Sequence, residues 1–351
     1  MRNTSAWRGR AVAAASLVAA LAAAACSSSG SSSSPASASG SNSAANGVSG
    51  QRFTLMLQST ANVSKVVEVH AVNILASEGV QTSVKWNAST PNVAISELTS
   101  GDIDAYSEAV TGGVSAVSAG VPLVDFALAQ PRQDYVLLGR PGITSLSQLK
   151  GKKIGVQDTT GVNYAQALLA LKAAGLTTSD VSIVAVGGQS TRLPALVAGR
   201  VDATMLSHTA QLQLGPKGYT TLYDYTKQAS ELYDDNIFAT SNWLKQHEAL
   251  AVAFNKALLE SYQWFDNAAN DSDIVSEALK IDPTQDKTQL KQFFDELRAA
   301  NAYPEGTILN PSLLTQQEDL YKTAQAIQST VPVSQWVNAT PAKQALASLN
   351  G

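Results

Sequence analysis

The residues most able to carry chemistry in this chain are polar side chains that directly follow short apolar, strand-like segments. The densest set follows Lys153–Val156 and comprises Asp158, Thr159, Thr160, Gly161 and Asn163. An Ala/Leu-rich segment typical of a helix begins at the same place, and the first N–H groups of a helix attract anions and polar acceptors. The two threonine hydroxyls could cap this helix or contact a ligand. The segment therefore predicts either a helix cap or a binding site for a polar group.

Similar polar residues follow the other predicted strands. They are Gln58, Ser59 and Thr60, then Tyr106, Glu108 and Thr111, then Gln189 and Ser190, and finally His208. Because ligands of open α/β sheets bind beyond the carboxyl ends of the strands, we expect all these residues to line one ligand-binding cleft. For Ser59 and Thr60 the alternative is helix capping, and for His208 it is an ordinary surface or hydrogen-bonded histidine.

Glu108 and Tyr106 give the sharpest hypothesis about the ligand. A carboxylate at the end of a strand repels a sulfonate or nitrate unless a cation neutralises it. An aminopyrimidine or another nitrogenous ring could stack on Tyr106 and donate an amine hydrogen to Glu108. Alternatively Glu108 faces solvent or pairs with a lysine, and Arg132 and Arg192 are candidate partners for an anion. The sequence therefore leaves the charge of the ligand open.

Signatures of catalysis are missing from the sequence. No G-x-S-x-G, H-E-x-x-H, G-x-x-x-x-G-K-[S/T] or G-x-G-x-x-G motif occurs. Cys26 is the only cysteine, and the three histidines lie far apart in the chain, so we expect no cysteine nucleophile, no metal and no cofactor. Convergence of Asp158, Glu108 and His208 as acid–base groups is the enzymatic alternative.

The N-terminus has the pattern of an export signal. Three arginines precede the apolar run 11–25, which ends in "LAAAAC" at Cys26 and resembles a bacterial lipobox. We therefore expect a lipoprotein signal peptide at 1–25, with lipidation at Cys26. Residues 27–50 include 12 serines and 4 glycines, so 26–50 is predicted to be a disordered tether. The net charge of −4 and the lack of a basic patch argue against nucleic-acid binding.

An internal repeat organises the remainder of the chain. "LTSGDIDAYSEA" (98–109) and "LVAGRVDATMLSH" (196–208) share the spacing L-x-[S/A]-G-x-[I/V]-D-A. Each predicts a helix that ends at a glycine, followed by a buried strand. Each also closes a run of alternating strands and helices, which implies two parallel sheets with right-handed crossovers. The predicted runs are 53–57, 63–78, 80–86, 91–99 and 103–106 for one, and 153–156, 162–174, 181–186, 191–198 and 201–206 for the other.

The stretch "SLSQLKGKKIGVQDTTGVNYAQALLALKAAGLTTSDVSIVAVGG", followed by "PALVAGRVDA", resembles the substrate-binding proteins of ABC importers. It is most similar to the type II periplasmic binding proteins for nitrate, aliphatic sulfonates, taurine and thiamine-precursor pyrimidines. The resemblance implies a two-lobed α/β fold with a helical C-terminal region. Its predicted parts are lobe 1 at 51–137, lobe 2 at 138–222, and 223–351, which returns to lobe 1 and ends in helices.

The resemblance also implies a function. A monomeric, lipid-anchored receptor outside the cytoplasmic membrane would capture a small polar solute without chemical change. It would deliver that solute to an ABC permease driven by a separate ATPase. The alternatives are a pyrimidine-forming enzyme or a lyase on the same fold, and a tethered sensor domain for a membrane kinase.

Overall fold

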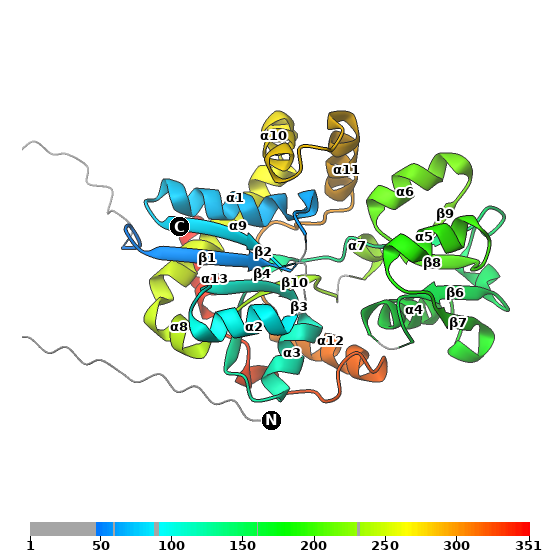
Figure 1. Cartoon of the computed structure of the whole chain (residues 1–351), viewed down its shortest axis with the longest axis horizontal. Coiled ribbons are helices and arrows are strands. Elements are labelled where there is room, and N and C mark those ends of the chain that lie inside the picture. The colour runs from blue at the N-terminus through cyan, green and yellow to red at the C-terminus, as the bar shows by residue number, and fades with distance from the viewer. Residues whose placement is uncertain (1–46, 59, 88–90, 160, 230–231) are drawn as a thin grey trace, which may run out of the picture. The chain divides into compact units, whose positions relative to one another are not determined.

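Two five-stranded sheets organise the part of the chain that the structure, a computed structural model, describes: residues 47–58, 60–87, 91–159, 161–229 and 232–351. The first sheet has the strand order β2-β1-β3-β10-β4 (Figure 1). Within it β1 is parallel to β2 and β3, and β10 runs antiparallel to β3 and β4. Its strands are β1 (Arg52–Leu57), β2 (Gln81–Trp86), β3 (Ala105–Ala109), β4 (Leu123–Gln130) and β10 (Asp235–Thr240).

The second sheet repeats the same plan with the order β7-β6-β8-β5-β9. Here β5 is the strand that runs antiparallel to both of its neighbours, in the position that β10 has in the first sheet. Its strands are β5 (Val136–Gly139), β6 (Lys153–Val156), β7 (Ser182–Ala185), β8 (Ala203–Leu206) and β9 (Thr220–Asp224). The predicted two-lobed α/β fold with mainly parallel sheets is confirmed. We call the first sheet with its helices lobe 1 and the second lobe 2.

The repeated aspartate in the two "G-x-[I/V]-D-A" segments performs the same task in each lobe. Asp104 Oδ2 accepts a hydrogen bond of 2.8 Å from the backbone N–H of Thr54 in β1. Asp202 Oδ2 accepts one of 2.8 Å from the N–H of Lys153 in β6. Each glycine before it, Gly101 and Gly199, has the positive φ of a helix-ending residue. The repeat therefore fixes β3 against β1 in lobe 1 and β8 against β6 in lobe 2.

Alternating side chains on β1 divide the core of lobe 1 between the two faces of the sheet. Phe53, Leu55 and Leu57 pack with α1 (Val66–Ser77), α8 (Ser241–Gln246) and α9 (Glu248–Asp266). Met56 packs on the opposite face with α2 (Pro91–Ser100), α3 (Val110–Ser118) and α12 (Pro311–Thr323). Both faces are covered, as expected of a mainly parallel sheet.

The remaining helices belong to lobe 2 and to the C-terminal region. In lobe 2, α4 (Val162–Ala173) and α7 (Tyr225–Gln228) cover one face of the sheet, and α5 (Gln189–Val197) and α6 (His208–Leu214) cover the other. The C-terminal helices are α10 (Asp271–Ile281), α11 (Lys287–Ala299) and α13 (Thr340–Leu349). Helix α12 packs on α4 and α11 on α6, so C-terminal helices contact lobe 2 as well as lobe 1. No helix within the described ranges is long and apolar enough to cross a membrane.

The chain passes between the lobes twice, after β4 and after β9. We call residues 131–135 the first crossover and residues 225–234 the second crossover. The predicted helix 162–174 agrees with α4 almost to the residue, whereas β10, α3 and α6 were not predicted. Strand β3 lies two to three residues later than the predicted 103–106. Residues 47–50, assigned above to the tether, form a turn whose Val48 is buried in the core of lobe 1.

Candidate functional site

A cavity of about 630 Å³ opens between the lobes, beyond the carboxyl ends of β1, β3 and β6. Both crossovers contribute to its wall, and so does Phe293 of α11. Its volume suits a small organic molecule. The lining residues are Gln58, Asn62, Val63, Ser64, Lys65, Glu108, Ala109, Gln130, Asp134, Tyr135, Gln157, Asp158, Gly161, Val162, Asn163, Gln189, Ser207, Thr209, Asp234, Asp235 and Phe293.

The structure brings six of the sequence-predicted site residues together in this wall: Gln58, Glu108, Asp158, Gly161, Asn163 and Gln189. Tyr106 and His208 lie directly behind it, each bonded to a lining residue. The side chains of Thr60, Thr159 and Ser190 are exposed elsewhere, and Thr111 lies in the first turn of α3. Ser59, Thr160 and Cys26 lie outside the described residues.

Asn62 and Gly161, rather than Thr60 or Thr159, occupy the N-cap positions where the first helical turn before α1 and helix α4 begin. Asn62 caps the 3-10 turn Val63–Lys65 that leads into α1, and its side chain accepts from the N–H of Ser64 at 3.0 Å. Helix α4 begins after Gly161, whose φ of +95° suits glycine and which has no side chain to act as a cap. An ideal β-carbon on Gly161 would lie 3.0 Å from Asp158 Oδ1, so the Asp158 carboxyl lies beside the start of α4.

Glu108, Tyr106 and Gln58 form a hydrogen-bonded chain at the end of β3. The Tyr106 hydroxyl lies within hydrogen-bonding distance of both Gln58 Oε1 and Glu108 Oε2. Gln58 Oε1 also accepts from Asn87 Nδ2 at 3.0 Å, and Glu108 Oε1 accepts from the N–H of Ala109 at 3.0 Å. The tyrosine ring is buried in the core of lobe 1, so its face is not open for a ligand to stack on. Tyr106 therefore acts on the site through its hydroxyl.

Burial sets the protonation of Glu108. Loss of water around its carboxyl raises the pKa of Glu108 to about 7, with the Asp235 charge adding to the rise, while the Tyr106 hydroxyl opposes it. Burial also raises the pKa of Tyr106, so its hydroxyl stays protonated at neutral pH. Glu108 thus exchanges a proton within the physiological range.

Among the described residues of the wall, Lys65 carries the ammonium group, and this group already pairs with carboxylates of the protein. It contacts Asp235 and lies 3.1 Å from Glu68 Oε1, and its Nζ donates to Gln130 Oε1 at 3.3 Å. Burial opposes the charge of Lys65, but the nearby carboxylates outweigh it and raise the pKa. Glu68 is fully buried, which raises its own pKa. This cluster ties the start of α1 to β10.

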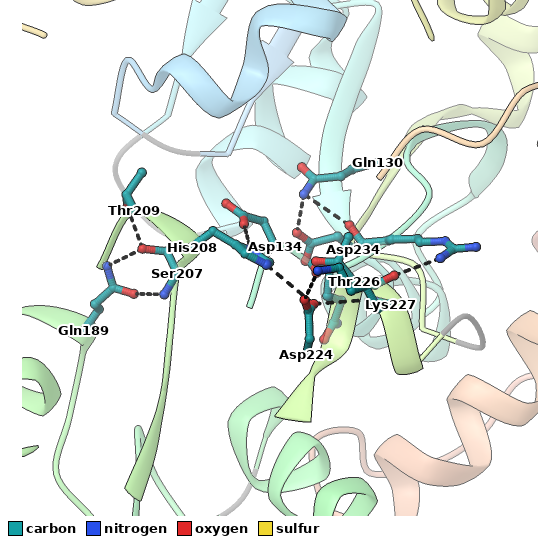
Figure 2. Close-up of polar contacts among 12 residues, drawn as sticks. Gln130, Asp134, Gln189, Ser207, His208, Thr209, Asp224, Thr226, Lys227 and Asp234 are labelled. Carbon is teal, nitrogen blue, oxygen red and sulfur yellow. Dashed lines mark hydrogen bonds and ion pairs between the residues drawn. The ribbon is translucent and has the colours of Figure 1, made fainter. Parts of the chain in front are cut away.

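His208 joins the two crossovers (Figure 2). Its Nδ1 lies 2.5 Å from Asp134 Oδ1 in the first crossover, and its Nε2 lies 3.5 Å from Oδ1 of Asp224, the last residue of β9, which immediately precedes the second crossover. Burial lowers the pKa of His208, but the two carboxylates outweigh it and raise the value to about 9. A charged imidazolium between two carboxylates therefore links both crossovers at neutral pH.

Hydrogen bonds also join the crossovers directly. Gln130 at the end of β4 donates from Nε2 to Asp234 Oδ2 at 2.8 Å (Figure 2). Thr226 Oγ1 donates to the carbonyl of Gln133 at 2.6 Å. Arg132, considered above as an anion partner, donates instead to the carbonyl of Thr226 at 2.9 Å. The crossovers therefore behave as one connected pair at the base of the cavity.

In lobe 2 the remaining polar groups mostly bond to each other. Gln189 bridges to Ser207 through two hydrogen bonds of 2.9 and 3.1 Å (Figure 2). Arg192 is 2% exposed and donates to the carbonyls of Met205 and Gly187, so its guanidinium holds β8 to α5 rather than facing the cavity. Burial lowers its pKa.

The sequence analysis missed the wall residues that lie in the crossovers or directly beside them: Gln130, Asp134, Tyr135, Asp234 and Asp235. It also missed Lys65. The available signal was the placement of "QPRQDY" and "YDD" between strands of different lobes, because a chain that passes between lobes must cross the cleft. Within the described residues, no group of three or more His, Asp, Glu or Cys side chains is arranged to hold a metal ion.

Two similar α/β lobes, joined by two crossovers around one polar cavity, define the class of two-lobed, type II periplasmic-binding-protein folds. Residues 75–270 match the family described as NMT1/THI5 like, and the chain belongs to this family. This confirms the family resemblance drawn from the sequence. Comparison with curated proteins finds no match.

Solved structures share the fold at low sequence identity. The periplasmic sulfonate-binding protein SsuA from Methylobacillus flagellatus is 17% identical, with a TM-score of 0.68 over 86% of this chain and 95% of that one. The zinc-bound ligand-binding component of an ABC-type import system from Staphylococcus aureus is 16% identical, with a TM-score of 0.66 over 84% and 99%. The desulfurization enzyme DszB is 14% identical, with a TM-score of 0.59 over 85% and 99%. The fold therefore occurs in both binding proteins and an enzyme.

Proposed function

We propose that this protein is the solute-binding component of an ABC importer, located outside the cytoplasmic membrane. The observation that carries the proposal is the cavity of about 630 Å³ whose wall is shared by both lobes and both crossovers. A solute bound there contacts both lobes, so binding favours their closure over it. The closed form then presents a combined surface of the two lobes to a membrane permease.

The composition of the wall supports binding rather than chemistry. Its polar groups are mostly engaged in bonds that position them, as in the Gln189–Ser207 pair and the Gln130–Asp234 pair. His208 is held between two carboxylates behind the wall, where it is 2% exposed and so poorly placed to exchange protons with a substrate. The described residues contain no cysteine, which excludes a thiol nucleophile from the cavity.

The finer points of the proposal come from the sequence. Lipidation of Cys26 would anchor the protein, and the Ser-rich segment would hold the lobes away from the membrane. We propose that the receptor works as a monomer with a separate permease and ATPase. An enzyme on this fold, for which DszB is a precedent, is the alternative that a test has to separate.

Lobe closure can be measured directly because Cys26 is the only cysteine. In the full chain carrying Cys26→Ser, dyes on Val93→Cys and Val197→Cys would report the distance between α2 of lobe 1 and α5 of lobe 2. Both valines are exposed, at 45% and 52%, so labelling should not disturb the core. The protein is titrated with a nutrient panel of amino acids, amines, sulfonates, nitrate, pyrimidines and purines.

A saturable rise in energy transfer, with the compound recovered unchanged, supports a binding protein. Conversion of the compound into a product supports the enzymatic alternative instead. If no compound in the panel changes the transfer efficiency, the proposal that this cavity captures a nutrient is refuted.

A further inference from the structure

The wall of the cavity carries many more acidic than basic groups, and this bears on which solute the proposed function would serve. Of the described lining residues, five have carboxyl groups and one, Lys65, has an ammonium group. The carboxyl groups belong to Glu108, Asp134, Asp158, Asp234 and Asp235. The charge of the solute that this wall favours depends on which of these charges the protein itself already balances.

Among the residues that the structure describes, the positive charges in the wall and directly behind it are committed to the protein itself. Lys65 is bound between Asp235 and Glu68, and His208 lies between Asp134 and Asp224. The Arg192 guanidinium donates to backbone carbonyls and is buried behind the wall. An anion would therefore have to displace an existing partner from one of these groups, at the cost of leaving a buried carboxylate without its counter-charge.

The start of α4, which could otherwise attract an anion, already has one beside it. The Asp158 carboxyl lies next to Gly161, the residue from which α4 begins. A second negative charge there would be repelled. The helix start that the sequence predicts to attract a polar group is therefore unfavourable for a sulfonate or a nitrate.

The chain of hydrogen bonds at Glu108 contains a proton that can leave. The Tyr106 hydroxyl has a single hydrogen, yet its oxygen is in hydrogen-bonding distance of Gln58 Oε1 and Glu108 Oε2. Gln58 Oε1 can only accept, and it accepts from Asn87 as well. Both contacts of Tyr106 are satisfied together when Tyr106 donates to Gln58 and a protonated Glu108 donates to Tyr106. In this arrangement Glu108 is the neutral acid, and when Glu108 is ionised the Tyr106 hydroxyl donates to its carboxylate instead.

We propose that the solute is a small organic cation with N–H donors, such as an amine or amidine, and that Glu108 loses its proton when the cation binds. The inference rests on the proposed function, because it assumes that the cavity is the solute site. The carboxylate formed accepts a hydrogen bond from the cation, and the displaced proton goes to solvent. Charge in the cavity is conserved in this exchange.

The groups around Glu108 determine the sign of the pH dependence. Asp235 of β10 faces it and favours the protonated acid, whereas Lys65 at the start of α1, although paired, favours the carboxylate. The neighbours from β1 and α3 are Gln58 and Gly112, which carry no charge. With a pKa of about 7 in the free protein, Glu108 is mostly protonated at pH 6 and mostly ionised at pH 8. Affinity for a cation should then rise about tenfold between these pH values.

The test is isothermal titration calorimetry on the full chain at pH 6 and pH 8 with matched probes. Benzamidine, benzamide and benzoate share one planar shape and differ in charge. Butylamine and butanesulfonate make the same comparison for an aliphatic chain. Repeating the pH 6 titration in buffers of different ionisation enthalpy counts the protons released.

We expect benzamidine or butylamine to bind, to bind about tenfold more tightly at pH 8, and to release up to one proton at pH 6. Glu108→Gln should abolish the pH dependence and weaken binding at pH 8 by about tenfold or more, the usual effect of losing a charged hydrogen bond. The matched control Glu260→Gln should change neither, because Glu260 pairs with Lys256 on the surface of α9.

Three results would overturn the inference. The first is binding of benzoate or butanesulfonate that persists or improves in Glu108→Gln. The second is cation binding that is indifferent to pH and to Glu108, and the third is no binding of either cation. In each case, a different nutrient that closes the lobes in the energy-transfer experiment would still support the proposed function. Failure of the cation proposal can therefore be distinguished from failure of the proposed function.

Discussion

The link that His208 makes between the crossovers should appear as a pH-dependent part of the stability. In the folded protein its pKa is raised from 6.5 to about 9, because the stabilising effect of the Asp134 and Asp224 carboxylates exceeds the cost of burial. A pKa that is higher in the folded state adds stability below the unfolded value and loses it as the pH rises through the folded value. The contribution of His208 is thus complete near pH 6 and lost by about pH 9.5.

Its size follows from the pKa change. A rise from 6.5 to about 9 corresponds to about 3 kcal/mol at 1.36 kcal/mol per pKa unit. No large discount for solvent screening applies, since the His208 side chain is 3% exposed. We therefore expect His208→Gln to lower the free energy of unfolding by about 3 kcal/mol more at pH 6 than at pH 9.5.

Urea unfolding of the full chain at the two pH values measures this difference. Tryptophan fluorescence and far-UV circular dichroism should give coincident transitions, so that a two-state free energy is defined. His247→Gln is the matched control, since His247 contacts Gln51 in lobe 1 and touches neither crossover. It should keep the pH dependence of the wild type. If His208→Gln also keeps it, the imidazolium does not link the crossovers and our account of the electrostatics there is refuted.

Three further predictions concern the lobes and the anchor. Gly113→Ala should destabilise the protein by about 2 kcal/mol or more in thermal unfolding, because the new β-carbon would lie 2.1 Å from the Phe238 ring. An unchanged melting temperature would mean that α3 can shift to make room for it. Asp202→Ala should cost about 1 kcal/mol, because it removes the hydrogen bond to the N–H of Lys153 at an exposed position, where the net value of such a bond is modest. A neutral result would show that the repeated aspartate has no structural task. Cys26→Ser should move the protein from the membrane to the soluble fraction, whereas continued membrane retention would contradict lipidation.

The sequence was informative wherever a local pattern decides the structure. The repeat around Gly101 and Gly199 located a helix end and a buried strand in each lobe, since few residues other than glycine adopt a positive φ there. The predicted strand 53–57 likewise agrees with β1, in which Phe53, Leu55 and Leu57 alternate and pack on α1 and α9. Both signals depend only on residues close together in the chain.

The candidate site was less predictable because its residues meet only after the lobes are assembled. Asp234 and Asp235 approach Glu108 and Lys65 through β10, a strand whose partners are distant in sequence. The sequence of β10 has no alternation of apolar and polar residues that would predict a strand, because β10 is buried on both faces and is only six residues long. The structure has a cavity at the strand ends that the sequence singled out, but the strand-end rule could not decide which polar side chains face the cavity and which bond to each other.

The same residues form the wall of the cavity and connect its two halves, which gives binding a direct mechanical effect. Asp134 lines the cavity and holds His208, while Asp234 lines it and accepts from Gln130 across the crossovers. A solute that draws either carboxylate toward itself weakens a contact that fixes the relation between the crossovers. In the lobe closure proposed above, binding free energy would act directly on the segments that bend, so no separate transmission path would be needed.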